Sequence, residues 1–359
     1  VKSMKSIQVN LDKRSYSIDI ESGILKKCSS LLNEHNNGQK WIIISQYNLM
    51  ELFGFSFLKE LKKNNFDVDF ITLPNGETAK SINEYSRIIN QMIEYGCDRK
   101  STIICLGGGV VGDVSGFVAS SFMRGINYFQ IPTTLLAMVD SSIGGKTGIN
   151  VSQGKNLIGA IYQPKGVLVD PQLLASLPKE EVNAGIGEII KYGAIWDKSF
   201  LVQIGSWLND INNFPFETAI SASCEIKAKI VSKDENENGI RRILNFGHTI
   251  GHALESHLGY GKIRHGDAVS FGMKCSGYVS EQLNYITKED LLILTNTIDK
   301  LPLPQLPKID PKYLLPFIKN DKKTEKGKLN FVVLDDLGNA KTTTKVNEKL
   351  ILESLKVLN

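Results

Sequence analysis

The sequence predicts an α/β fold in which an N-terminal domain with a parallel sheet precedes a mostly α-helical domain. In the first half, short apolar strands alternate with amphipathic helices, an order typical of a parallel sheet covered on both faces. A glycine cluster directly follows one of these strands. From about Leu173 onward the long segments have helical periodicity. We therefore predict domains at 1–171 and 172–359, with the boundary near Asp170-Pro171.

The elements of the first half follow from the spacing of apolar residues. Residues 41–44, 66–73 and 102–106 are predicted strands, because each is a short run rich in β-branched and aromatic side chains. Residues 81–95 are predicted to form a helix, with an apolar stripe at Ile82, Tyr85, Ile89, Met92 and Ile93.

The second half is predicted to be mainly helical. We expect helices at 179–195, 216–233, 241–258 and 267–283, and a closing helix at 348–358. The proline-rich stretch 301–316 is predicted to be a connector, and residues 331–334 a late strand.

Composition excludes several functional classes. The 42 basic and 38 acidic residues give a formal charge of +4, spread along the chain, which argues against a nucleic-acid binder. No apolar run approaches the length of a membrane span, so no membrane association is predicted. The five cysteines form an odd set without a Cys-x-x-Cys pair, which favours unpaired thiols in a reducing cytoplasm.

Two segments in the first half indicate a nucleotide site. Residues 107–113 fit G-x-G-x-x-G between a predicted strand and helix, where backbone N–H groups can approach a pyrophosphate, although a tight structural turn would have the same pattern. The acidic residue expected about 20 residues later is missing, so a standard Rossmann unit is not predicted. Glu77 and Lys80 lie in a turn before a helix, and a helix-terminal charge with a solvated lysine is the alternative interpretation.

Four of the five histidines cluster within 18 residues and indicate a metal site. His248 and His252 are four apart and project from one helical face, where imidazoles can share a divalent ion. His265 follows a glycine-containing loop, and Glu188 is a carboxylate in an apolar helix. Isolated helical histidines are usually surface or core residues, but the cluster favours metal binding. We predict His257 to be structural.

Further polar residues suggest that an anion is recognised. Arg241, Asn245, His248 and His252 are spaced to share one helix face, which could also be merely solvated. Two loops, 140–148 and 154–157, place Lys146 and Lys155 among glycines and small residues, as phosphate-binding loops do. The Gly-Gly-Lys-Thr segment lacks the first glycine of a P-loop, so an ATPase is rejected.

Together these segments resemble the dehydroquinate synthase family. The resemblance covers 107–124, 132–150, 154–163, 187–193, 241–255 and 265–273 in unbroken order, and the combination of SSIGGKTG with LNFGHTIGHALE is highly specific. It implies an NAD-binding N-terminal domain, a helical metal-binding domain and a homodimer.

The resemblance also implies roles for individual residues. The metal, zinc or cobalt, would be held by Glu188, His248 and His265. The substrate would contact Asp140, Lys146, Lys155, Asn156, Lys191, Lys227, Arg241, Asn245 and His252, with Arg124 reaching the phosphate across the dimer interface and either Lys322 or Lys323 as a late lysine. NAD would contact Glu77, Lys80, Gly108, Gly109, Val110, Asp113, Thr133 and Thr134, together with Asp140, Lys146 and Lys155. One departure is Ser45-Gln46, where the family often has an Asp or Asn that contacts the ribose.

The implied reaction converts 3-deoxy-D-arabino-heptulosonate 7-phosphate to 3-dehydroquinate and phosphate, a step of the shikimate pathway to aromatic amino acids. It would proceed by transient NAD oxidation, phosphate elimination, reduction and intramolecular aldol closure. Lys146, Lys191 and Arg124 are expected on the phosphate side. Lys227, Arg241 and Asn245 are expected at the carboxylate and hydroxyls, and His252 as a proton relay or phosphate contact.

Three alternatives make different predictions. A metal-dependent polyol dehydrogenase would share the fold and metal site but would release NADH. Another sugar-phosphate cyclase, acting on a substrate without a carboxylate, would have little use for Arg241 and Asn245. A non-catalytic nucleotide-binding or scaffold protein would be expected to have lost a metal ligand, and none is lost here.

Overall fold

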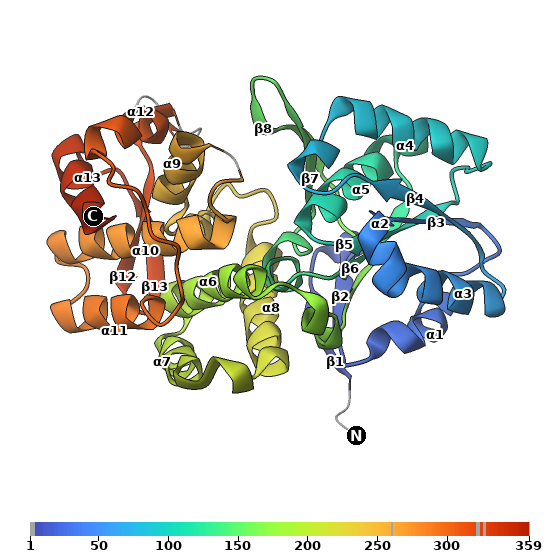
Figure 1. Cartoon of the computed structure of the whole chain (residues 1–359), viewed down its shortest axis with the longest axis horizontal. Helices are drawn as coiled ribbons and strands as arrows, with labels where there is room; N and C mark the ends of the chain where they lie inside the picture. Colours follow the sequence, from blue (N-terminus) through green and yellow to red (C-terminus); the bar gives the residue numbers. More distant parts are fainter. Residues whose placement is uncertain (1–3, 260, 321–323, 326–327, 359) are drawn as a thin grey trace. The chain divides into compact units, whose positions relative to one another are not determined.

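The computed structural model describes residues 4–259, 261–320, 324–325 and 328–358. The chain forms two compact units, which are described separately (Figure 1). The first unit runs to Leu177 and includes Ile220–Glu235, and the second comprises Pro178–Ala219 and the chain from Asn236. None of the described helices is both long enough and apolar enough to cross a membrane.

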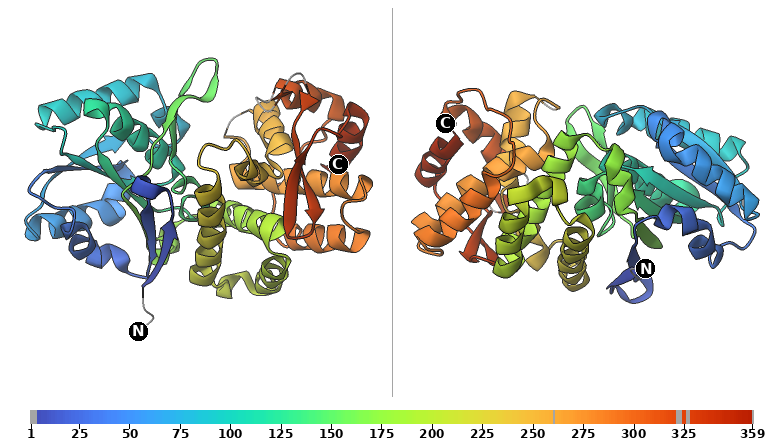
Figure 2. Two further views of the ribbon diagram at one scale, coloured as in Figure 1. Left: turned by 180° about the vertical axis from the view of Figure 1, so that it is seen from behind. Right: turned by 60° about the horizontal axis from the view of Figure 1, so that its bottom comes forward.

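A seven-stranded sheet forms the centre of the first unit (Figures 1 and 2). Its strand order is β1-β2-β9-β6-β5-β3-β4, and only the β1–β2 pair is antiparallel. The bounds are Lys5–Val9 (β1), Tyr16–Ile20 (β2), Lys40–Gln46 (β3), Asp67–Leu73 (β4), Thr102–Gly107 (β5), Asn127–Pro132 (β6) and Gly166–Val169 (β9). The three strands predicted from the sequence are β3, β4 and β5, and all are confirmed.

Helices cover the sheet, as the alternating pattern predicted. One core joins Ile88 and Met92 of α4 and Val111 and Val114 of α5 to side chains of β3 and β5. The helices of this unit are Cys28–Asn33 (α1), Tyr47–Leu49 (α2), Phe55–Lys63 (α3), Ile82–Glu94 (α4) and Gly109–Ser121 (α5), with shorter helical turns at Glu77–Ala79 and Ala137–Ser141. The predicted helix at 81–95 is confirmed as α4, and Ser81 caps it by accepting a hydrogen bond from the Glu84 N–H.

Two segments expected to be loops form a β-hairpin instead. Strands Lys146–Val151 (β7) and Gly154–Ile161 (β8) pair antiparallel in a separate two-stranded sheet. The prediction of basic loops at 140–148 and 154–157 is therefore wrong for Lys146 and Lys155, which lie in strands. Glycine favoured the loop interpretation, but in the structure Gly148 and Gly159 face one another and allow the two backbones to approach closely.

The helix Phe216–Lys233 (α8) was predicted at its observed bounds, but most of it belongs to the first unit. The thiol of Cys224 donates to the Met138 carbonyl oxygen, and the Asn10 N–H donates to the Ser232 hydroxyl. These contacts join α8 to elements far earlier in the chain. The two compact units therefore differ from the predicted domains in two ways. The first unit continues six residues beyond residue 171, to Leu177, and it also includes most of α8.

The second unit is mainly helical, with one antiparallel hairpin. Its helices are Lys179–Trp196 (α6), Lys198–Trp207 (α7), His248–Leu258 (α9), His265–Gln282 (α10), Lys288–Ile298 (α11), Pro311–Asn320 (α12) and Glu348–Ser354 (α13). The hairpin pairs Phe331–Asp336 (β12) with Asn339–Thr343 (β13), and a two-residue pair joins Thr324–Glu325 (β10) to Lys328–Leu329 (β11). Most of the predicted helices and the late strand are thus confirmed.

Two predictions for this unit are wrong. The expected helix at 241–258 is a 3-10 turn, Ile240–Asn245 (η9), followed by α9, because Gly247 adopts a left-handed φ of 79° between them. The expected connector at 301–316 ends at Pro311, which opens α12, and Pro316 lies inside that helix. Proline fits the first helical turn because its missing N–H would have no partner there.

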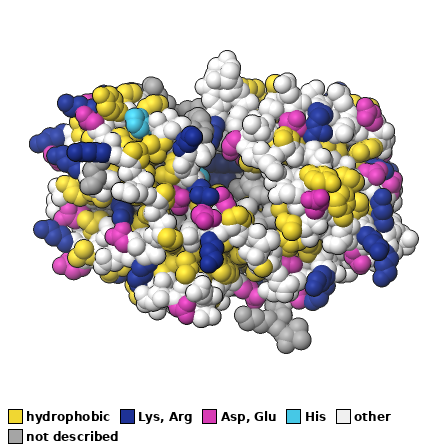
Figure 3. All heavy atoms as spheres, in the orientation of Figure 1, with side chains coloured by type: hydrophobic (Ala, Val, Ile, Leu, Met, Phe, Trp, Pro, Cys, Tyr) yellow, Lys and Arg dark blue, Asp and Glu magenta, His cyan; other side chains and the backbone are white. Residues whose placement is uncertain are grey.

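Charged side chains on the face seen in Figure 3 are interspersed by sign rather than gathered into one basic surface. This distribution agrees with the small formal charge of +4. It gives that face no broad electrostatic footprint for a nucleic acid.

Candidate active site

The glycine cluster forms the strand–turn–helix arrangement that its spacing predicted. Strand β5 ends at Gly107, Gly108 is the N-cap, and α5 begins at Gly109. The Thr133 N–H donates to the Gly107 carbonyl at 3.0 Å, and a Cβ on Gly108 would lie 3.0 Å from the Thr134 methyl carbon. The predicted NAD residues Gly108, Gly109, Val110, Thr133 and Thr134 are therefore gathered at the start of one helix.

The strand beside this turn departs from the family pattern in the way noted above. The Ser45 side chain is buried, and its hydroxyl donates to the Leu106 carbonyl at 2.6 Å. Its hydroxyl proton is therefore committed to the backbone. Gln46, which is partly exposed at the end of β3, is the better candidate for a contact with a ribose hydroxyl.

Lys80 is buried, so the alternative of a solvated lysine is wrong. Only 4% of its surface is exposed, and its ammonium donates to Asp113 Oδ2 at 2.6 Å and to Asn156 Oδ1 at 2.5 Å. Burial raises the pKa of Asp113, and the charge of Lys80 opposes that rise. Glu77 accepts a hydrogen bond from Asn150 Nδ2 at 2.7 Å. Predicted NAD residues thus contact the β7–β8 hairpin directly.

A second buried ion pair connects α8 to the turn at Ala137–Ser141. The Lys227 ammonium donates to both the carbonyl oxygen and Oδ1 of Asp140, each at 2.7 Å. Two predicted substrate residues more than 80 positions apart are thereby brought together. Arg124 is exposed in a turn after α5, and its φ of 69° and that of 49° at Met123 are both left-handed.

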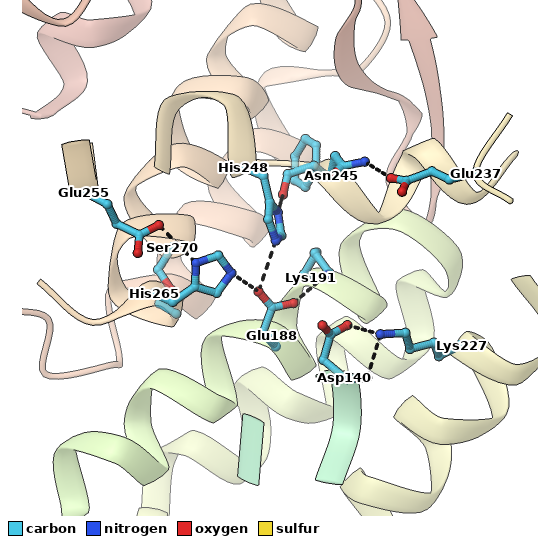
Figure 4. Close-up of polar contacts among 12 residues, drawn as sticks. Asp140, Glu188, Lys191, Lys227, Glu237, Asn245, His248, Glu255, His265 and Ser270 are labelled. Carbon is cyan, nitrogen blue, oxygen red and sulfur yellow. Dashed lines mark hydrogen bonds and ion pairs between the residues drawn. The ribbon is translucent and has the colours of Figure 1, made fainter. Parts of the chain in front are cut away.

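In the second unit, the predicted metal ligands converge from three helices (Figure 4). Glu188 of α6 is fully buried, and its Oε1 lies 3.6 Å from His248 Nε2 and 3.8 Å from His265 Nε2. His248 and His265 are the first residues of α9 and α10. One ligand atom from each of the three side chains lies within 4.8 Å of the others.

These separations suit a shared divalent ion better than direct hydrogen bonds. Bonds of about 2.0–2.1 Å in a tetrahedral zinc site place ligand atoms roughly 3.4 Å apart, close to the observed spacing. A carboxylate with two imidazoles is also a donor set that zinc and related ions accept. The residues present therefore fit the metal that the resemblance implies.

Each imidazole is oriented by a contact at its other nitrogen. His248 Nδ1 lies 3.2 Å from the Phe246 carbonyl oxygen, and His265 Nδ1 lies 3.1 Å from Glu255 Oε2. Both oxygens can only accept, so each Nδ1 is the donor in these contacts and each Nε2 is left on the side of Glu188. Burial would lower the pKa of His265, but the hydrogen bond and charge of Glu255, with the charge of Glu188, raise it overall.

Close helix packing holds these ligands together. A Cβ at Gly266 of α10 would collide with the Ala184 carbonyl of α6, and a Cβ at Gly247 would lie 2.7 Å from the Val269 carbonyl of α10. Glycine at both positions lets the helix backbones touch.

The remaining predicted polar residues of this unit do not share one helix face. Lys191 and Arg241 are buried, and Lys191 forms an ion pair with Glu188. The Asn245 amide donates to Glu237 Oε1 at 2.5 Å. The break at Gly247 separates Arg241 and Asn245 from α9, so the predicted single face through His252 is wrong.

Other histidine and lysine predictions have different outcomes. The His252 ring is stacked at 5.8 Å from that of His265, near the ligand cluster. His257 instead stacks at 6.4 Å on Tyr313, in line with a structural role. Lys322 and Lys323 lie outside the described residues.

Sequence reasoning missed Glu255, Glu237 and Asn150. Glu255 had a usable signal, because it lies seven residues after His248 and so on the same helical face. Glu237 and Asn150 act through a loop and a hairpin whose geometry no local spacing reveals.

Comparison with known proteins agrees with this geometry. The chain matches the family models described as 3-dehydroquinate synthase N-terminal, over residues 70–184, and 3-dehydroquinate synthase C-terminal, over residues 185–324. A 3-dehydroquinate synthase of Rippkaea orientalis is 42% identical over 352 residues, covering 96% of this chain and 96% of that protein.

Solved structures agree on the fold. A 2-deoxy-scyllo-inosose synthase complexed with carbaglucose-6-phosphate, NAD+ and Co2+ matches with a TM-score of 0.85 at 25% identity, over 98% of this chain and 99% of that one. A 2-epi-5-epi-valiolone synthase of Streptomyces hygroscopicus subsp. jinggangensis, with NAD+ and Zn2+ bound, matches with a TM-score of 0.86 at 23% identity, over 100% and 98% of the chains.

The fold is that of these two synthases, a parallel-sheet α/β domain followed by a mainly helical one, which confirms the predicted fold class. Within that class the relationship is closer to one family, since the 42% identity extends over nearly the whole of both chains. The chain belongs to the 3-dehydroquinate synthase family of enzymes.

Proposed function

We propose that the chain converts 3-deoxy-D-arabino-heptulosonate 7-phosphate to 3-dehydroquinate and phosphate, with NAD and a divalent metal ion as cofactors. Family membership supports the reaction. The single structural observation that carries the proposal is the convergence of the buried Glu188 carboxylate with His248 and His265 beside the Lys191 ammonium. Such a set combines a metal site with a cation suited to an anionic substrate.

Glu188, His248 and His265 would hold zinc or cobalt. The chemistry that the cofactors supply when bound is polarisation of a substrate hydroxyl by the metal and reversible hydride acceptance by NAD. The relative whose structure contains NAD+ and Co2+ supports this choice of cofactors. Glu77, Lys80, Asp113, Thr133 and Thr134, with the turn at Gly108, Gly109 and Val110, would contact NAD.

The substrate carries a phosphate and a carboxylate, and the chain offers buried cations for both. Lys191, with Lys146 and Arg124, would bind the phosphate, and Lys227, Arg241 and Asn245 would bind the carboxylate and hydroxyls. Asp140, Lys155 and Asn156 would complete the contacts. Asp140 pairs with Lys227 and Asn156 pairs with Lys80, so these side chains are oriented before substrate binds.

His252 would relay a proton or contact the phosphate. Its ring is perpendicular to that of His248 at 5.5 Å and stacked on that of His265 at 5.8 Å. An imidazole beside the ligand cluster can pass a proton to or from a bound substrate, which the elimination of phosphate requires.

We further propose that the enzyme acts in the cytoplasm as a homodimer. The five cysteines are buried free thiols, which suits a reducing compartment. Arg124, which the resemblance places across the dimer interface, is exposed in this structure and so accessible to a second copy. Sedimentation of wild-type protein and Arg124→Ala, with phosphate-release assays of both, tests this part.

The main test is phosphate release from the heptulosonate phosphate, with NAD and added zinc or cobalt, while NADH absorbance is followed. Phosphate release without net NADH is expected, because NAD is regenerated in each turnover. NADH accumulation on polyols without phosphate release would instead indicate a polyol dehydrogenase. Glu188→Gln, which removes a predicted metal ligand, should abolish the phosphate release.

A further inference from the structure

The β7–β8 hairpin has an irregular register at the residues expected to contact substrate. Ile149 pairs with Ile158 and Val151 with Gly154, so Asn150 alone faces the three residues 155–157. A bulge of this kind leaves backbone groups outside the ladder and re-aims side chains, and bulges are common beside active sites. Asn156 adopts a left-handed φ of 54°, which asparagine tolerates better than most residues.

Asn150 connects this bulge to the neighbouring turn at Glu77 and Lys80 through three hydrogen bonds. Its Oδ1 accepts from the Asn156 N–H at 2.9 Å, and its Nδ2 donates to Glu77 Oε2 at 2.7 Å. Its own N–H donates to the Lys80 carbonyl at 2.8 Å. The side chain therefore joins the bulge to the turn that contains two predicted NAD residues.

The connection is closed by Lys80. The Lys80 ammonium donates to Asn156 Oδ1 at 2.5 Å while it pairs with Asp113. Asn150, Asn156 and Lys80 thus form a ring in which each residue contacts the other two. The Asn150 carboxamide accepts from a backbone N–H and also donates to the Glu77 carboxylate, whereas an ionised aspartate of the same size can only accept and so cannot replace asparagine here.

We propose that Asn150 is a positioning residue that couples NAD binding to substrate binding. Contact of NAD with the turn at Glu77 and Lys80 would also order the bulge that presents Lys155 and Asn156 to the substrate. The inference rests on the proposed function and adds to it a residue to which that function assigns no ligand contact. Such coupling is reciprocal, so each ligand strengthens the binding of the other by the same factor, typically about 5–150-fold.

The experiment measures the NAD dissociation constant of the zinc-loaded protein by calorimetry, with and without a substrate analogue. The analogue is a phosphonate in which CH2 replaces the phosphate ester oxygen, so that no phosphate can leave. The ratio of the two NAD constants should be about 5 or more in wild-type protein. Asn150→Ala, which removes both side-chain hydrogen bonds, should bring the ratio close to one.

Two further variants keep the result interpretable. Asn150→Asp preserves the size of the side chain and the acceptor for Asn156, but it cannot donate to Glu77, so its ratio should also fall towards one. Gln153→Ala removes a carboxamide from the exposed turn of the same hairpin and should keep the wild-type ratio. Thermal unfolding of the wild-type protein and the three variants shows whether each of them is folded.

A wild-type ratio near one would overturn the proposal, as would an unchanged ratio in both Asn150 variants. A ratio that falls equally in Gln153→Ala would assign the effect to the hairpin as a whole and would also overturn the role of Asn150. Failure of the wild-type protein to bind NAD at all would instead contradict the proposed function, so the two failures are distinguishable.

Discussion

The two units organise their buried charges in different ways. In the first unit, each buried lysine makes direct contact with a carboxylate, 2.6 Å for Lys80 with Asp113 and 2.7 Å for Lys227 with Asp140. In the second unit, the Glu188 carboxylate also pairs with a buried lysine, Lys191, but its other oxygen lies 3.6 and 3.8 Å from the two imidazoles that face it (Figure 4). The first arrangement is a closed set of hydrogen bonds, and the second is spaced as a set of ligands.

The difference separates two kinds of preorganisation. The paired network of the first unit distributes its contacts, so that loss of one partner leaves others in place. The three ligands of the second unit would bind one shared ion, and each of them is essential for binding it. Mutations should therefore have graded effects in the first unit and all-or-none effects in the second.

The largest effect is expected for Glu188→Gln. The change removes one of three ligands and leaves the Lys191 ammonium buried without its carboxylate. Zinc affinity, measured by competition with a chelator, should fall by well over 100-fold. Unfolding of the metal-free protein should lose about 3–5 kcal/mol, the usual cost of breaking a buried ion pair.

The matched control is Glu181→Gln on the same helix. Glu181 is exposed and pairs with Arg264 at 2.7 Å, an interaction worth at most about 1 kcal/mol. Equal losses of zinc affinity in the two variants would contradict the placement of Glu188 as a ligand.

Lys80→Met should have the next largest effect, and a graded one. Loss of a hydrogen bond to a charged group weakens binding by roughly 1.5–3 kcal/mol, or about 10–150-fold in the NAD dissociation constant. Because Lys80 opposes the rise in the pKa of Asp113, its removal should raise that pKa further. Calorimetric titration with NAD measures the loss, and Lys59→Met, at an exposed position on α3, should leave binding unchanged.

Glu255→Ala should weaken the metal site without destroying it. The carboxylate orients His265 through Nδ1 but lies on the far side of the ring from Glu188 (Figure 4). Loss of such an orienting contact typically costs about 10–100-fold in metal affinity. The absorption spectrum of the cobalt-loaded protein should also change as the imidazole reorients.

Glu255→Gln provides the comparison, since its amide oxygen can still accept from Nδ1. It should retain more affinity than the alanine variant. Wild-type affinity and an unchanged cobalt spectrum in Glu255→Ala would contradict the role of Glu255 in orienting His265.

The smallest effect compares a glycine from each unit. Gly23 and Gly247 are both left-handed, with φ of 84° and 79° and ψ of 12° and −20°, but a Cβ on Gly23 would lie no closer than 3.6 Å to the Gln172 side chain, whereas one on Gly247 would lie 2.7 Å from the Val269 carbonyl. Both alanine variants should lose the roughly 1–2 kcal/mol of a left-handed residue. Gly247→Ala should lose at least about 1 kcal/mol more in denaturant unfolding, because α9 and α10 must separate. Equal losses of unfolding free energy in the two variants would mean that α9 and α10 can separate at little energetic cost.

Local patterns predicted the elements whose formation depends on nearby residues. Strands β3 and β5 are apolar runs that form where predicted, and the glycine turn before α5 has the context that its spacing requires. His248 and His252 share a helix, as their four-residue spacing indicated. The ligand set itself came from resemblance, because no spacing links Glu188 to residues 60 or more positions later.

Long-range packing decided the features that local patterns missed. Arg241 to His252 has good helical spacing, yet the chain turns at Gly247 because α10 packs directly against that backbone. The segment around Lys155 looked like a glycine loop, yet pairing with β7 makes it a strand. In both cases, contacts with another element outweighed the preference of the segment itself.

By itself, the sequence determined the α/β class, the nucleotide turn, the histidine-bearing helix and, through its motifs, the family. Only the tertiary structure decided that Glu255 orients His265, that Lys80 is buried against Asp113, and that Asn150 joins the hairpin to the turn at Glu77. The physical reason is that elements form from local periodicity, whereas hydrogen bonds and ion pairs between them depend on distances that only packing sets.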